Sequence, residues 1–202
     1  MRVTTKVKTE TRQRILDTAL ERFKTDGWHG TTTRAIAVAA GVATGTLFNY
    51  FASKEALAAT LIGDRLGVGK RDERKGPVEE TPEADLFEFI WTGFSNLRDL
   101  RAFLAPAAET IFSPLARSSV ESPGDAIRID HLEQVEAILA GHGFQGPRPL
   151  VAQQLYWTLY LGVFAFWAAD ESPGQEDTLA LLDQSLKLYV ASLNEPLRKE
   201  TS

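Results

Sequence analysis

The sequence contains no cysteine among its 202 residues, which excludes a disulfide framework, a cysteine-ligated metal centre and a thiol nucleophile. Histidine is nearly as scarce: His29, His131 and His142 are the three residues of this type, and none has metal-ligand spacing. No HExxH motif, Gly-rich phosphate loop or nucleophile elbow is present in the sequence. We therefore expect no metal, no cofactor and no enzymatic activity.

Long apolar runs are also missing. Residues 1–10 have no apolar core, so we expect no secretory signal peptide and a cytoplasmic protein. The most apolar stretch, 155–169, has 15 residues with Thr158 as its one polar side chain, whereas a membrane-spanning helix needs about 20 residues. A helix that is apolar nearly all round is buried on more than one side. We expect no membrane span here, but burial against the protein's own core and against a partner subunit.

The total formal charge of −5 argues by itself against nucleic-acid binding, since phosphate contacts require Lys and Arg. The charge is unevenly distributed, however. Residues 1–75 carry 14 Lys and Arg against 8 Asp and Glu, whereas residues 76–202 carry 8 against 19. The first region is therefore net +6 and the second net −11, which indicates two regions with different partners.

Nearly every patterned segment has helical spacing, and no run alternates with period two for long enough to make a strand. The pattern predicts helices over 11–26, 82–100, 124–141, 149–170 and 175–194. We therefore predict an all-α fold, with an N-terminal three-helix helix-turn-helix domain and a larger C-terminal helical bundle. The domain boundaries that we expect are 1–67 and 83–195, separated by a Gly-, Pro- and charge-rich linker or interhelical loop over 68–82.

The most informative segment is 31–57, which has the pattern of a helix-turn-helix. Thr32 is a good N-cap for a short helix, and Gly41 can adopt the positive φ that ends it. A second short helix is expected from residue 43 or 44 to residue 50. It exposes small residues that fit a major groove: Thr46 and Asn49 can meet base edges, and Thr44 and Tyr50 can reach phosphates.

A third helix is expected to begin after Ser53, which can cap it. Lys54 then lies in the first turn, where the helix dipole disfavours a cation. A nearby DNA phosphate would explain a lysine at this position.

The same segment closely resembles the N-terminal DNA-binding domain of TetR-family (tetracycline-repressor-like) regulators. The similarity runs without gaps over residues 10–62. It rests on the following residues: Ile15, Leu16, Ala19, Phe23, Gly27, Thr32-Thr33-Arg34, Ile36-Ala37, Ala40-Gly41-Val42, Gly45-Thr46-Leu47, Tyr50-Phe51 and Ser53-Lys54-Glu55-Ala56-Leu57.

This resemblance implies a homodimeric, ligand-responsive transcriptional regulator, usually a repressor that binds a palindromic operator. It implies DNA contacts at Thr33, Arg34, Thr44, Gly45, Thr46, Asn49, Tyr50 and Lys54.

In two places the sequence departs from the family pattern. Phe48 stands where the family often has Tyr, so a hydroxyl contact to phosphate is lost and we expect Phe48 only to pack. Ala43 stands where Ser is frequent, and we expect Thr44 to cap the helix instead. The basic residues Lys6, Lys8, Arg12 and Arg14 could add phosphate contacts.

The C-terminal region has no comparable motif but is rich in aromatic residues. Their surplus suggests that some line a cavity, and aromatic walls suit flat or cationic molecules. Our candidates for binding a small, apolar or aromatic effector are Trp91, Phe94, Phe112, Trp157, Tyr160 and Phe164.

The last two helices, 149–170 and 175–194, are the candidates for dimerisation, because their apolar residues exceed what one monomer core requires. In the TetR family such helices commonly pair into a four-helix bundle.

Two alternative functions fit the same residues less well. One is a helical adaptor that binds another protein through the apolar C-terminal face, and the other is a helical enzyme.

Overall fold

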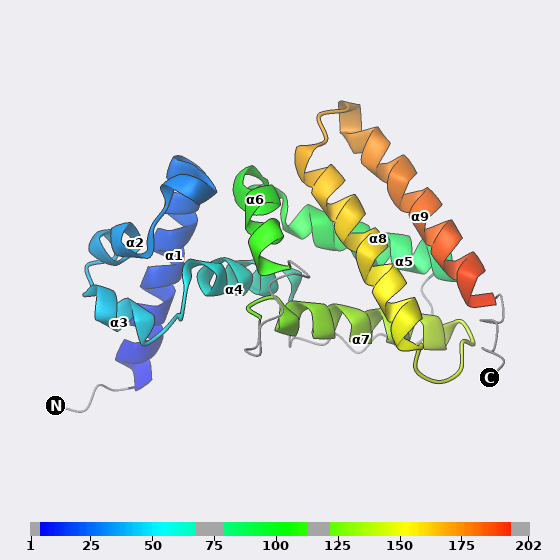
Figure 1. Ribbon diagram of the computed structural model, residues 1–202, viewed down its shortest axis with the longest axis horizontal. Helices are drawn as coiled ribbons and strands as arrows, with labels where there is room; N and C mark the ends of the chain where they lie inside the picture. The colour runs from blue at the N-terminus through cyan, green and yellow to red at the C-terminus, as the bar shows by residue number, and fades with distance from the viewer. Residues whose placement is uncertain (1–4, 68–78, 113–121, 195–202) are drawn as a thin grey trace, which may run out of the picture. The chain divides into compact units, whose positions relative to one another are not determined.

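The computed structural model describes residues 5–67, 79–112 and 122–194, and within these ranges every regular element is helical (Figure 1). The all-α prediction is therefore confirmed. By contacts the chain forms two units, the first of residues 1–68 and 97–127 and the second of residues 69–96 and 128–202. Residues 68–78, which make up most of the expected linker, lie outside the described ranges.

The first unit contains α1 (Thr5–Gly30), α2 (Thr33–Ala39), α3 (Thr44–Phe48) and α4 (Lys54–Leu66). It also contains the short helix η1 (Arg98–Leu100) and α6 (Arg101–Ile111), a segment that the sequence analysis assigned to the second domain. Helix α1 begins six residues before the expected helix and is interrupted near its end by Gly27, whose φ is 71°.

The core of the first unit forms where the apolar stripe of α1 meets the other helices. Ile15, Leu16 and Phe23 are completely buried, as the sequence pattern predicted. Helix α6 packs against both α1 and α4, and the rings of Phe23 and Phe103 lie 4.9 Å apart. The helix-turn-helix region is therefore stabilised by α6, whose Phe103 follows its ring partner Phe23 by 80 residues in the chain.

The carboxylate of Asp99, on the surface, links the same helices through ion pairs. Asp99 of η1 accepts a bond from Lys24 of α1 at 3.3 Å and from Arg65 of α4 at 3.0 Å. Partial burial would raise the pKa of Asp99, but the hydrogen bonds from Arg65 and Lys24 outweigh it and hold the pKa below its usual value. All three side chains are partly exposed, so water screens the attraction and we assign it a small contribution to stability.

The second unit contains α5 (Pro82–Asn96), α8 (Leu150–Ala169), η3 (Pro173–Gln175) and α9 (Glu176–Asn194), together with α7 (Asp125–Gly141) apart from its first turn. Helix α9 packs against both α5 and α8. Phe94 of α5 is stacked on Trp167 of α8 with ring centroids 4.9 Å apart, and the ring of Phe164 contacts both. The ends of α7, α8 and α9 lie within three residues of the sequence prediction.

Helix α8 is apolar on two sides. One side, which includes Tyr156, Tyr160 and Trp167, is buried within the unit, whereas Leu155 and Phe166 are 41% and 43% exposed. This is the two-sided pattern expected for the stretch 155–169. Within the ranges that the structure describes, no helix is both long enough and apolar enough to cross a membrane.

Candidate DNA-binding surface and ligand pocket

The turn between α2 and α3 has the geometry that the sequence predicted. The Thr32 hydroxyl accepts a hydrogen bond from the Ala35 amide at 3.1 Å and caps α2. Gly41 has a φ of 66°, and the next amide, of Val42, donates to the Ala37 carbonyl at 3.0 Å, which closes the turn. Because Ile36 and Leu47 are fully buried, α2 and α3 are fixed on the core and their opposite faces remain accessible.

Helix α3 is the expected recognition helix, although it is shorter than predicted and spans five residues. Gly45 and Asn49 are exposed, and Thr44, Thr46 and Tyr50 are half-buried. Phe48 is 48% exposed rather than packed away, so that expectation was wrong. The N-cap of α3 is Ala43 and no side chain caps it, so the expected substitute cap by Thr44 is absent.

The other predicted DNA contacts come from α1 and α2. Arg34 is exposed on the first turn of α2, and Thr33 beside it is half-buried. The basic residues near the N-terminus, Lys6, Lys8, Arg12 and Arg14, are all exposed. The guanidinium of Arg12 lies 5.2 Å from the centre of the Phe51 ring, which brings this part of α1 close to the end of the recognition helix.

Lys54 has partners within the protein. Its Nζ donates to the carbonyl oxygens of Trp28 at 2.8 Å and Thr31 at 3.3 Å, and it lies 4.2 Å from the centre of the Trp28 ring. The carbonyls that end α1 thus compensate the cation at the N-terminus of α4, while Ser53 caps α4 through the Ala56 amide. A phosphate is not needed to explain this lysine.

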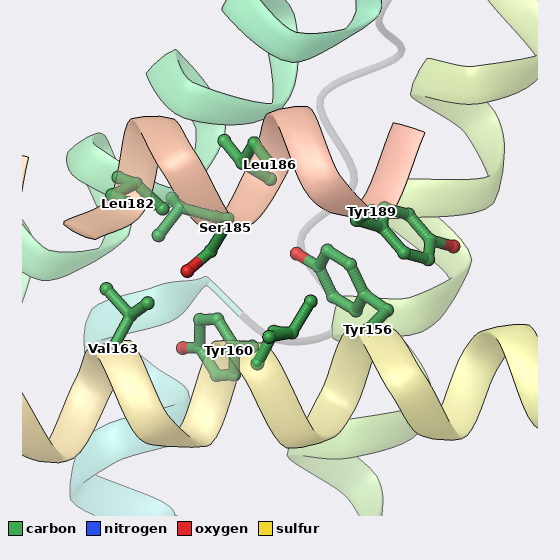
Figure 2. A pocket seen from close by; sticks show the side chains of 9 residues that line it. Tyr156, Tyr160, Val163, Leu182, Ser185, Leu186 and Tyr189 are labelled. Atoms are coloured by element: carbon green, nitrogen blue, oxygen red, sulfur yellow. The ribbon is translucent and has the colours of Figure 1, made fainter. Parts of the chain in front are cut away.

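A pocket lies within the second unit, between α5, α8 and α9 (Figure 2). The space between its walls is about 220 Å³ only when the part open to solvent is counted, and the pocket has room for about one water molecule. Four of its lining residues carry hydroxyl groups, namely Tyr156, Tyr160, Ser185 and Tyr189. The other five are aliphatic, namely Ile90, Leu159, Val163, Leu182 and Leu186.

The pocket carries no charge at neutral pH. Burial raises the pKa values of Tyr156 and Tyr160, and burial together with the nearby Glu136 carboxylate raises the pKa of Tyr189 to about 12. The Tyr156 hydroxyl is hydrogen-bonded at 2.8 Å to Nε2 of His131, a residue that does not line the pocket. Burial lowers the pKa of His131 to about 3, so this imidazole is neutral as well.

The six aromatic residues proposed from the sequence as ligand contacts are not gathered around this pocket. Tyr160 lines it, but Phe94 and Phe164 belong to the cluster around Trp167, and Phe112 belongs to the first unit. Trp91 is half-buried on α5 and does not line the pocket. Trp157 faces His131 and the guanidinium of Arg128.

Sequence reasoning missed most of the pocket wall, including Tyr156, Ser185 and Tyr189. One signal was available. Tyr156 and Tyr160 are four residues apart, as are Ser185 and Tyr189, so each pair shares one helix face. The spacing groups each pair but does not reveal that the two faces meet.

Comparison with known proteins supports the helix-turn-helix assignment. Residues 15–61 match the family described as bacterial regulatory proteins, tetR family. The HTH-type transcriptional regulator UidR of Escherichia coli K12 is 42% identical over 52 residues, 26% of each protein. The HTH-type transcriptional regulator YvkB of Bacillus subtilis is 32% identical over 78 residues, 39% of this chain and 38% of that protein. The similarity thus spans less than half of these curated relatives.

Solved structures extend the similarity to the whole fold. FadR of Thermus thermophilus, a TetR-family transcriptional repressor solved with lauroyl-CoA, has a TM-score of 0.64 at 22% identity and covers 95% of this chain and 98% of its own. A TetR transcriptional regulator of Rhodococcus sp. RHA1 has a TM-score of 0.63 at 24% identity, covering 93% and 100%. Residues 15–61 are thus similar to the tetR-family domain, and the chain has the same fold as these two solved regulators. Its matched relatives are named as transcriptional regulators, not enzymes.

Proposed function

We propose that this protein is a homodimeric transcriptional regulator that represses from a palindromic operator and is released by a small-molecule effector. The main support is the exposed face of α3, where Gly45 and Asn49 can approach base edges while Leu47 anchors the helix in the core. Arg34 on α2 and the basic part of α1 supply cations near this face for phosphate contacts.

Gel-shift titration with DNA flanking the protein's own gene tests DNA binding. We expect specific retardation whose affinity falls steeply with salt, because Lys and Arg displace counterions from the phosphates. The variant Asn49→Ala should relax sequence preference, whereas Arg34→Ala should weaken all sites alike. Arg22→Ala is the matched charge control, since Arg22 pairs with Asp26 within α1 at 3.0 Å. Absence of specific retardation at every protein concentration would refute the proposal.

Two copies of the recognition helix must reach half-sites about 34 Å apart, so operator binding requires a dimer. The support for dimerisation is the apolar outer face of α8 and α9, which includes Val151, Leu155, Phe166 and Leu188, between 41% and 68% exposed. Such a row of apolar side chains is typical of an interface.

The alternative function, a helical adaptor for another protein, would use this same outer face. Size-exclusion chromatography with light scattering separates the two possibilities. A stable symmetric dimer would occupy the face and support the regulator, whereas a monomer would favour the adaptor.

The Thermus thermophilus repressor of the same fold was solved in complex with lauroyl-CoA. Release from the operator is tested by adding candidate molecules to the protein–DNA complex and following the loss of the retarded band.

A further inference from the structure

We propose that one face of the first turns of α1 binds the phosphate backbone beside each operator half-site through Lys8 and Arg12. We call this side of the helix the Lys8–Arg12 face. It rests on the function proposed above and adds two residues to the DNA-binding surface. Both residues precede residues 15–61, the segment that matches the tetR-family description, so that similarity assigns them no role.

Lys8 and Arg12 lie on the side of α1 that packs on the core further along the helix. Residues four apart share one helix face, and this spacing leads from Lys8 through Arg12 to Leu16, which is completely buried. Residues 5–10 are all exposed, so they extend beyond the packed part of α1. The core-facing side of the helix thus continues past the core as an exposed basic surface.

A ring contact places this face next to the recognition helix. The guanidinium of Arg12 lies 5.2 Å from the centre of the Phe51 ring. The Phe51 amide donates to the Leu47 carbonyl at 3.0 Å, which fixes the ring at the end of α3. In Figure 1 the first turns of α1, in dark blue, continue past α3. Because a recognition helix lies in a major groove about 12 Å wide, cations beside its end face a bordering phosphate backbone.

The Arg12 guanidinium is oriented but not neutralised. The Phe51 ring lies against it, the residue is exposed, and no carboxylate of the described residues is paired with it. Arg65, in contrast, is paired with Asp99 at 3.0 Å. A planar guanidinium that a ring already orients keeps its N–H donors for a phosphate and loses less entropy on binding it.

The other two basic residues of this part of the chain, Lys6 and Arg14, lie on the opposite face of α1. Glu10 is four residues from each of them on that face, and Asp17 follows one turn later. These carboxylates reduce the attraction for a phosphate there. No Asp or Glu between positions 5 and 23 shares the Lys8–Arg12 face. The four exposed cations are therefore not equivalent.

The contacts made by this face are with phosphates rather than bases. Lys8 and Arg12 are one turn apart, about 6 Å along the helix axis, so they can neutralise separate phosphates. Contacts of this kind orient the recognition helix in its groove and carry no sequence information.

Gel-shift titration of the full chain at several salt concentrations tests the proposal, with the operator fragment and a random-sequence duplex as probes. Lys8→Ala and Arg12→Ala should each lower the slope of log Kd against log salt on the operator by about 2. A dimer carries each residue twice, and each phosphate contact contributes about 0.9 to this slope. Both variants should weaken binding to the two probes by the same factor, because the lost contacts are independent of sequence.

Variants of the opposite face provide the comparison. Lys6→Ala and Arg14→Ala remove the same charge about one helix diameter away, roughly a Debye length at 0.1 M salt, and should change the slope less than half as much. Arg22→Ala, whose charge is paired within α1, should leave the slope unchanged. Urea unfolding shows whether each variant is folded. If Arg12→Ala is destabilised by the loss of its ring contact, the exposed Lys8 carries the test.

Equal slope changes for the variants of both faces would overturn the proposal, as would a wild-type slope for folded Lys8→Ala or Arg12→Ala. Wild-type protein that binds neither probe would overturn it together with the proposed function. Specific operator binding with unaltered slopes refutes the phosphate contacts of α1 alone. If the operator is not preferred but the expected slope changes occur on the random-sequence duplex, the operator-specific function alone is refuted.

Discussion

The ammonium group of Lys54 lies over the indole of Trp28, 4.2 Å from its ring centre, while donating a hydrogen bond to the carbonyl of the same residue. This contact joins the start of α4 to the end of α1. It gives Lys54 a role in holding the helix-turn-helix together that is independent of DNA.

Replacing Lys54 should therefore reduce stability as well as DNA affinity. We expect Lys54→Ala to lower the free energy of unfolding by about 1–3 kcal/mol, from the lost cation–π contact and the lost charge-assisted hydrogen bonds. Urea unfolding of the free protein measures this. Lys8→Ala, which removes an exposed charge from α1, should leave the unfolding midpoint unchanged. An unaltered midpoint for Lys54→Ala would contradict this stabilising role of the lysine.

Phe48 should read thymine. Its half-exposed ring on the recognition helix has no polar group, and apolar side chains contact the thymine methyl in the major groove. Replacing a contacted thymine of the selected operator by deoxyuridine should cost the wild type about fourfold in affinity, from roughly 0.8 kcal/mol for one buried methyl-sized group. Phe48→Ala should bind both operators equally. If the variant still distinguishes them, another residue contacts the methyl group.

The outer face of α8 and α9 should control assembly. A charge placed at Phe166 or Leu188, 43% and 67% exposed, would be desolvated in a dimer but hydrated in a monomer. We expect the double variant Phe166→Glu, Leu188→Glu to be a folded monomer by light scattering and to lose operator binding. Ile129→Glu on α7, where the side chain is 58% exposed, makes the same change on another helix and should remain dimeric. A dimeric double variant would contradict the assignment of this face.

Acid should weaken the link between α8 and α9. Asp170 accepts hydrogen bonds from the Thr178 hydroxyl at 2.5 Å and the Ser172 amide at 2.8 Å, and these hold its pKa well below the usual value of 3.8. Because the folded state binds this proton less readily than the unfolded state, Asp170 stabilises the fold above about pH 4 and loses that effect as the pH falls further. Thermal unfolding across pH 2–7 should show Asp170→Asn less stable than the wild type at pH 7, with the two curves converging in acid. A constant difference would contradict this.

Local signals sufficed for most of the fold. Thr32, Gly41 and Ser53 act through hydrogen bonds and backbone angles within a few residues, and the structure confirms all three. Helix α6 was not predicted as a helix, and it contains Pro106, which removes a backbone donor and normally argues against a helix interior. Packing of Phe103 on Phe23 supports it instead, and no local pattern carries that information.

The candidate sites were predicted incompletely for the same reason, because their contacts join residues that are far apart in the chain. The dipole argument correctly indicated that Lys54 needs a partner, but the carbonyl of Trp28 lies 26 residues away in the chain. The pocket depends on which turn of α9 faces which turn of α8, so Tyr156 and Ser185 meet only after the helices pack. Aromatic content alone therefore pointed to core residues such as Phe94 as readily as to the wall residue Tyr160.

Helix α8 has a wall of the pocket on one side and exposed apolar residues on the other, with Tyr160 and Phe166 less than two turns apart. A molecule that rotates α8 about its axis when it enters the pocket moves the pocket wall and the exposed apolar residues together. Where the outer side associates with a second copy, thermodynamic reciprocity makes ligand affinity depend on the concentration of the protein itself. A dilute sample and a concentrated one would then respond to different doses of the same molecule.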